Sequence, residues 1–266
     1  MKKKLLKIGA FCLAAAMIVG LAIFANGLIG NPISYLLARS TAKKHLQNNY
    51  AETDYELDSV SYSFKTGGYY VHVVSPSSED SSFTLSISST GKLDYSDYEY
   101  RVEGRGNTAS RLYAQYRDAV QGVLHSSFYP YTLSMGYGRL EFEQEEGETL
   151  PDGFWRKTDL ELDRVYNINE IAKTNGRLVL YVDSDEVSEG KAAEILLTTK
   201  RLFDEVGVKF YSVYFVLDYA AEEGALRPEG SIRCREFLYT DIYEEGLLER
   251  IREAAKATEE EGNKEK

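Results

Sequence analysis

Three short patterns in the sequence contain residue types that carry out chemistry in known enzyme classes. Serine and lysine three positions apart, the spacing of acyl-transferring Ser–Lys enzymes, occur at Ser40/Lys43, Ser89/Lys92 and Ser188/Lys191. The Ser-x-Asn element of those enzymes does not follow any of the pairs at a suitable distance. The chain is so rich in serine and lysine that chance accounts for the three pairs, so we predict no acyl enzyme.

A glycine-rich pattern, Gly104-x-Gly106-x-x-Ala109, lies between a predicted strand and a predicted helix, where a dinucleotide-binding fingerprint would lie. The segment before it is acidic and rich in tyrosine, whereas the fingerprint follows a buried apolar strand. No acidic residue follows about twenty positions later to bind a ribose. We therefore interpret the pattern as a loop capped by Asn107 and predict no cofactor.

The sequence signals for a metal-binding site are equally weak. No His-x-x-x-His or Cys-x-x-Cys spacing occurs, and the three histidines are isolated in the sequence: His45, His72 and His125. Asp183-x-Asp185 begins like a calcium loop, but Val187 and Ser188 occupy positions that need a ligand and a glycine. We predict no metal site and no catalytic residues.

Tyrosine is unusually frequent, with 21 tyrosines against a single tryptophan. Tyr95, Tyr98 and Tyr100 lie close together in the first half of the chain, and tyrosine offers a large contact area at low entropic cost. They are the candidate surface for a protein or glycan partner. The alternative is that tyrosine simply suits the half-buried faces of a sheet.

Charge is distributed unevenly along the 266 residues. The net charge is −11, yet residues 1–50 hold seven basic residues and no acidic one, so the rest of the chain carries −18. An acidic body repels phosphate, and it contains no basic patch with interleaved aromatic residues. The composition therefore excludes nucleic-acid binding.

Residues 8–29 form an apolar run in which Asn26 is the only strongly polar residue. As a helix this run is about 33 Å long, enough to cross a hydrocarbon core of about 30 Å. A cleaved signal peptide is the alternative, but its apolar region is about 7 to 15 residues and ends in a small-x-small site. We therefore expect residues 1–30 to form a cytoplasmic stub and a transmembrane anchor.

Four lysines precede the apolar run, at positions 2, 3, 4 and 7. Basic residues remain on the cytoplasmic side of a membrane helix, so we expect the N-terminus inside the cell and the acidic body outside it. The sequence thus predicts a protein of the cell membrane with an extracytoplasmic body.

The apolar and turn patterns after the anchor predict an α+β fold made of two units. Residues 31–130 predict a helix, an antiparallel meander and a second amphipathic helix, with a boundary near Pro130. Residues 131–258 predict most of a ferredoxin-like α/β plait, with 131–143 as one of its strands. The acidic residues 259–266 are expected to form a disordered tail.

Apolar spacing also selects core positions in the first unit. Asn31 and Pro32 predict a helix start, and this helix carries apolar residues at helical spacing: Ile33, Leu36, Leu37 and Leu46. Alternation in the meander predicts inward side chains on three strands: Val60, Tyr62 and Phe64 on the first, Val71 and Val73 on the second, and Phe83, Leu85 and Ile87 on the third.

Five segments carry a resemblance to a known family: NPISYLLARSTAKKHL, YSFKTGGYYVHVVSP, NTASRLYAQYRDAV, DLELDRVYNINEIAKTNG and EILLTTKRLFDEVGVKFYSV. In these segments the chain resembles the uncharacterised YfjL-like membrane-anchored proteins of Gram-positive bacteria. The resemblance covers nearly the whole chain after residue 30. It implies the anchor and the two-unit architecture, and it implies no catalytic residue.

The sequence therefore favours a non-enzymatic binding module of the cell envelope, held by a single-pass anchor and acting on a protein or another envelope component. Two alternatives remain open. One is an envelope hydrolase whose acid/base carboxylates are hidden among 42 acidic residues, and the other is an inhibitor or folding helper of a secreted enzyme.

Overall fold

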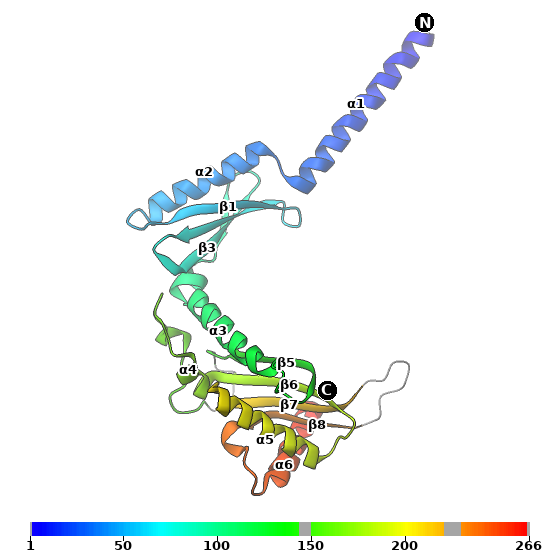
Figure 1. Cartoon of the computed structure of the whole chain (residues 1–266). Helices are drawn as coiled ribbons and strands as arrows, with labels where there is room; N and C mark the ends of the chain where they lie inside the picture. The colour runs from blue at the N-terminus through cyan, green and yellow to red at the C-terminus, as the bar shows by residue number, and fades with distance from the viewer. Residues whose placement is uncertain (1, 144–149, 221–229, 265–266) are drawn as a thin grey trace. The chain divides into compact units, whose positions relative to one another are not determined.

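The computed structural model describes residues 2–143, 150–220 and 230–264 of the chain (Figure 1). The chain divides into two compact units, residues 1–107 and residues 108–266. Both units combine helices with a four-stranded sheet, so the predicted α+β class is confirmed.

The first unit begins with two helices, α1 (Lys2–Ile29) and α2 (Pro32–Asn49). An antiparallel sheet follows in the strand order β1 (Glu56–Ser63), β2 (Gly68–Ser75), β3 (Ser78–Ser88) and β4 (Leu93–Ser96). A π-helical turn, η1 (Glu99–Glu103), closes the unit. Helix α1 is long and apolar enough to cross a membrane.

Helix α2 packs on the sheet because strict alternation gives β2 and β3 one apolar face. The buried side chains of that face are Val71, Val73, Phe83, Leu85 and Ile87. As predicted, Asn31 caps the helix, its side chain accepting a hydrogen bond from the Ser34 amide at 2.8 Å. Phe64, predicted to point inward, is instead exposed in the β1–β2 turn.

The apolar stripe of α2 does not face the sheet. Small side chains fill the inward face of this helix (Ser34, Ala38 and Ala42, with Leu46 at its far end), while Ile33, Leu36 and Leu37 are exposed. Small residues let the helix backbone approach the sheet closely, and this leaves the larger apolar side chains on the outside.

The junction between α1 and α2 depends on Gly30. Its φ of +73° is in the left-handed region, and a Cβ there would lie 2.6 Å from the Tyr69 hydroxyl and 2.9 Å from the Tyr62 ring. The Tyr69 hydroxyl donates to the Asn31 carbonyl at 3.0 Å, and the Tyr62 hydroxyl donates to the Gly27 carbonyl at 3.0 Å. The end of α1 is thus hydrogen-bonded to β1, and the start of α2 to β2.

The second unit contains four α-helices in the described part of the chain: α3 (Gly106–Leu124), α4 (Ile168–Asn175), α5 (Glu189–Val206) and α6 (Leu247–Lys264). Its sheet has the order β5 (Thr132–Leu140), β6 (Gly176–Ser184), β7 (Ser212–Tyr219) and β8 (Ser231–Leu238). Short 3₁₀ turns lie at η2 (Lys157–Asp159) and η3 (Tyr239–Asp241).

One face of this sheet packs on a core that includes side chains of α3, α5 and α6. Every second residue of the central strands points into it, including Leu178 and Leu180 of β6 and Phe215 of β7. Tyr116 of α3 is fully buried there, and its hydroxyl donates to the Lys209 carbonyl at 3.0 Å. Cys234 of β8 is buried, and burial raises the pKa of its thiol to about 12.

Two details differ from the sequence-based expectation. The sequence pattern places helix α3 in the first unit, with a boundary near Pro130, whereas the structure divides into units between Asn107 and Thr108. The physical reason is that Leu112, Tyr116 and Val120 of α3 belong to the core of the second unit. Helix α6 also runs on to Lys264, into the segment expected to be disordered.

The strand order of the second unit is not that of a ferredoxin-like plait. In the plait another strand separates the two parallel strands joined by a helix. Here β6 and β7, joined by α5, pair directly with each other in parallel, with Leu180 opposite Phe215. Strands β5 and β8 flank this pair in antiparallel orientation.

Candidate functional site: a charged groove on the second sheet

The face of the second sheet opposite its core carries polar and aromatic side chains. The alternation that turns Leu178 and Leu180 toward the core turns Arg177, Val179 and Tyr181 to this other face. Neighbouring strands contribute in register, so that Arg139 lies beside Arg177 and Ser212 lies on its other side. The groove described below is built on this face.

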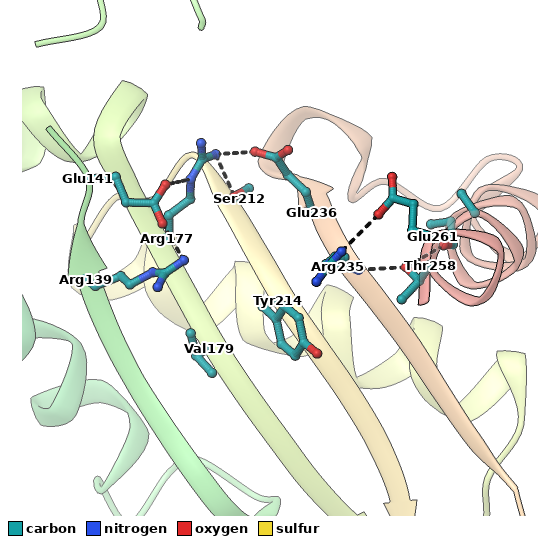
Figure 2. A pocket seen from close by; sticks show the side chains of 12 residues that line it. Arg139, Glu141, Arg177, Val179, Ser212, Tyr214, Arg235, Glu236, Thr258 and Glu261 are labelled. Atoms are coloured by element: carbon teal, nitrogen blue, oxygen red, sulfur yellow. Dashed lines mark hydrogen bonds and ion pairs between the residues drawn. The ribbon is translucent and has the colours of Figure 1, made fainter. Parts of the chain in front are cut away.

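The groove has a volume of about 570 Å³ and crosses the sheet at the end where β6 and β7 begin (Figure 2). Strands β5 to β8 form its floor, and the second half of α6 forms a wall. Three arginines and three glutamates line it: Arg139, Arg177, Arg235, Glu141, Glu236 and Glu261. Smaller and aromatic side chains complete the lining: Val179, Ser212, Tyr214, Ala254, Ala257 and Thr258.

Arg177 lies at the centre of the charged network, with only 8% of its side chain exposed. Its Nε donates to Glu141 Oε2 at 2.7 Å, and its Nη1 donates to Ser212 Oγ at 2.9 Å and lies 2.6 Å from Glu236 Oε1. The guanidinium also lies 4.8 Å from the centre of the Tyr211 ring. A buried guanidinium with two carboxylate partners is held in one orientation.

Arg139 extends the network to the edge of the groove. Its Nη2 lies 2.5 Å from Glu141 Oε1, so one carboxylate bridges two arginines. About half of the Arg139 side chain is exposed, in contrast to Arg177. Arg139 is therefore accessible to a ligand, while Arg177 orients the glutamates around it.

A β-bulge brings two consecutive residues of β8 into the groove. Val213 pairs with Phe237 and Phe215 pairs with Cys234, so Tyr214 alone lies opposite both Arg235 and Glu236. Residues of a regular strand alternate between faces, but a bulge lets two neighbours point to the same side. Both Arg235 and Glu236 consequently line the groove.

Helix α6 covers the free edge of β8. The Arg235 amide, which has no strand to pair with at this edge, donates to Thr258 Oγ1 at 3.1 Å. The Arg235 Nη1 lies 3.4 Å from Glu261 Oε2 on the same helix. These contacts hold the helix against the strand and so form the wall of the groove (Figure 2).

The arrangement is suited to binding. A serine nucleophile needs an adjacent base, but the Ser212 hydroxyl contacts the Arg177 guanidinium. Glu141 and Glu236, the two carboxylates beside Arg177, are both bound by this one guanidinium. Among the residues that the structure describes, no group of three His, Cys, Asp or Glu side chains could hold a metal ion.

The structure places the three tyrosines of the predicted partner surface in different environments. Tyr95 on β4 and Tyr100 in η1 are both exposed. Tyr98 instead packs in an aromatic cluster, with its ring centre 4.7 Å from that of Tyr50 and 5.1 Å from that of Phe83. Tyr95 and Tyr100 are thus surface residues, and Tyr98 is part of the packing.

The sequence analysis did not find the groove. Its charged residues are spread over more than 120 positions, from Arg139 to Glu261, and no two of them form a recognisable motif. The one local signal is Arg177, a charge at the start of the apolar strand RLVLYV. Charged residues are rarely buried without a partner, so this arginine indicated that carboxylates lie nearby.

Two family models match the chain, one within each of its two units. Residues 2–97 match the YfjL-like N-terminal domain, and residues 116–252 match the YfjL-like C-terminal domain. The chain belongs to the YfjL-like family. The family resemblance stated from the sequence is therefore confirmed, and the groove lies within the region of the YfjL-like C-terminal domain, apart from the end of α6.

No curated protein matches the chain. Among solved structures, the chain is similar to a DUF5037 family protein from Ruminococcus gnavus ATCC 29149. The identity is 12%, the TM-score is 0.22, and the match covers 70% of this chain and 76% of the other.

Proposed function

We propose that this YfjL-like chain is a single-pass membrane-anchored binding module, and that its second unit holds an extended segment of a protein partner outside the cytoplasm. The observation that carries the binding function is the groove on the second sheet, with its six charged side chains held in defined pairs. The apolar helix α1 supports the anchor.

The charge pattern of the groove favours a peptide over other ligands. Arginines and glutamates are equally numerous in its lining, so the groove offers charged donors and charged acceptors side by side. An extended peptide presents both kinds of group along its length, whereas a polyanion would meet the three carboxylates. Ordered charges of both signs give an interface its specificity.

Accessibility of the charged groups also favours this ligand. About half of each of the Arg139, Arg235 and Glu236 side chains is exposed, so these groups can meet a partner. Arg177 is buried between them and supports the pair of glutamates. Tyr214 adds an aromatic surface to the floor.

Site-specific photocrosslinking in intact cells tests this proposal. A photoreactive amino acid at position 139, on the rim of the groove, is expected to capture a defined protein partner. The Arg235→Ala substitution removes a charged donor on the other side of the groove and is expected to weaken that capture about tenfold.

The matched control is Arg201 on α5, an exposed arginine in an i,i+4 pair with Glu205. A photoreactive group at position 201 should not capture the same partner, and Arg201→Ala should leave capture from position 139 unchanged. Equal capture from both positions would contradict the groove as the binding site. Turnover of an envelope substrate by the purified full chain would contradict a binding function.

A further inference from the structure

The outward face of α2 begins with large apolar side chains that the protein leaves uncovered. Ile33 is 73% exposed and Leu36 is 62% exposed, although Ser34 and Ala38 of the same turns are buried. Ile33 lies four residues after Ile29, the last residue of the apolar helix α1. The exposed apolar residues of α1 are thus followed in the sequence, directly after the turn at Gly30, by exposed apolar residues of α2.

A third exposed apolar side chain lies at the same end of the first unit. Phe64, in the β1–β2 turn, is 63% exposed, and it follows Tyr62 by two residues. The Tyr62 hydroxyl donates to the Gly27 carbonyl of α1 at 3.0 Å, which holds this end of β1 against the end of α1. We call Ile33, Leu36 and Phe64 together the apolar rim.

Basic residues follow the apolar rim on both elements. Arg39, Lys43 and Lys44 are exposed on α2, and Lys65 is exposed next to Phe64. Lys43 is ten residues after Ile33, which is about 15 Å along a helix. No acidic residue occurs between positions 1 and 50, so the basic charge on α2 is not offset within its own helix.

We propose that the apolar rim docks the first unit onto an anionic lipid surface, with Ile33, Leu36 and Phe64 among the upper acyl chains and the basic residues at the headgroups. Apolar side chains next to lysines and arginines are typical of helices that lie in a membrane interface. This inference rests on the proposed membrane anchor, because α1 brings the rim to the bilayer. Its continuity with α1 favours lipid over a protein partner.

The test uses the full chain with Cys12→Ser, because the remaining Cys234 is buried. A polarity-sensitive fluorophore is attached in separate variants at Leu36→Cys, at Phe64→Cys and, as a matched control on the same helix, at Gln47→Cys. The protein is reconstituted into vesicles of phosphatidylcholine with phosphatidylglycerol, with or without lipids that carry a quencher in the acyl chain.

The fluorophores at positions 36 and 64 are expected to shift to shorter wavelength and to be quenched by the acyl-chain quencher, each at least twofold more than at position 47. Equal and weak quenching at all three positions in vesicle-bound protein would overturn the docking and leave the anchor intact. A blue shift at 36 and 64 that grows with protein concentration and is not quenched would also overturn it, because a second copy then covers the rim.

A failure of the membrane anchor is detected by washing the vesicles, and a failure of the docking is detected by fluorescence. If α1 does not span the bilayer, alkaline washing removes the protein from the vesicles before any fluorescence is measured. Retention after this wash, together with quenching at positions 36 and 64, supports both proposals. Variants with Ile33→Ser and Leu36→Ser should remain anchored but lose the quenching at position 64.

Discussion

Arg177 is the residue on which the geometry of the groove depends. Its guanidinium contacts both Glu141, the residue after β5, and Glu236 of β8, so it joins segments on both sides of its own strand. Burying a charge is costly unless charged partners and hydrogen bonds compensate for it. The network therefore stabilises the fold only as long as it is complete.

We predict that Arg177→Leu destabilises the second unit by about 2 to 3 kcal/mol. The buried arginine is lost, Glu236 loses its contact with this arginine, and Glu141 keeps only Arg139. Removing one partner costs about 3 to 5 kcal/mol in a fully buried network. The expected loss of stability is smaller here because Glu236 is half exposed and solvent screens its charge. Chemical unfolding of the full chain in detergent, followed by the fluorescence of Trp155, measures this change.

Trp155 is the single tryptophan of the chain and lies in the second unit, so its signal reports on that unit. The control is Arg201→Leu, which removes an exposed arginine paired only with Glu205 in the same helix and should change stability by less than about 0.5 kcal/mol. Equal stability of the two variants would contradict a central role for Arg177.

At the level of elements, the wall of the groove is formed because β8 is an edge strand. Edge strands expose backbone donors and acceptors, and proteins cover them with helices or loops. Here the Thr258 hydroxyl accepts the hydrogen bond from the Arg235 amide, a bond that a neighbouring strand would otherwise supply. The position of α6 and the bulge in β8 are thus linked at Arg235.

Thr258→Val tests this link with little change in side-chain shape. The Arg235 amide loses its acceptor, which we expect to cost about 1 to 2 kcal/mol and to increase hydrogen exchange at this amide. Thr258→Ser retains the hydroxyl and should exchange close to the wild-type rate. Unchanged exchange in the valine variant would show that the Thr258 hydroxyl does not protect the Arg235 amide.

Elements with local signals could be predicted from the sequence, and the groove could not. Ser188 and Gly207 set the ends of α5 by local signals, because a capping hydroxyl and a residue at positive φ act within one turn. The choice of β7 as the partner of β6 depends on how the crossover helix packs. The bulge that brings Arg235 and Glu236 together depends on register, which alternation alone does not fix.

At the level of the whole molecule, the separation of charge along the chain is the main constraint on orientation. The first 50 residues are basic, and the rest of the chain carries a net charge of −18. Anionic lipid headgroups attract the first part and repel the second. In an anchored chain, this separation favours contact of the basic helix α2 with the headgroups and keeps the later, acidic residues away from them.

We predict that the N-terminus lies in the cytoplasm and that the chain after α1 lies outside it, because Lys2, Lys3, Lys4 and Lys7 precede the apolar run. In a Cys12→Ser background, a cysteine introduced at Arg201 on the exposed side of α5 should react with a membrane-impermeant maleimide in intact cells. A cysteine introduced at Lys3 should react only after the cells are opened. The reverse pattern would show the opposite orientation. A labelled protein in the medium that begins near Asn26 would show that the residues before Asn26 are a cleaved signal sequence.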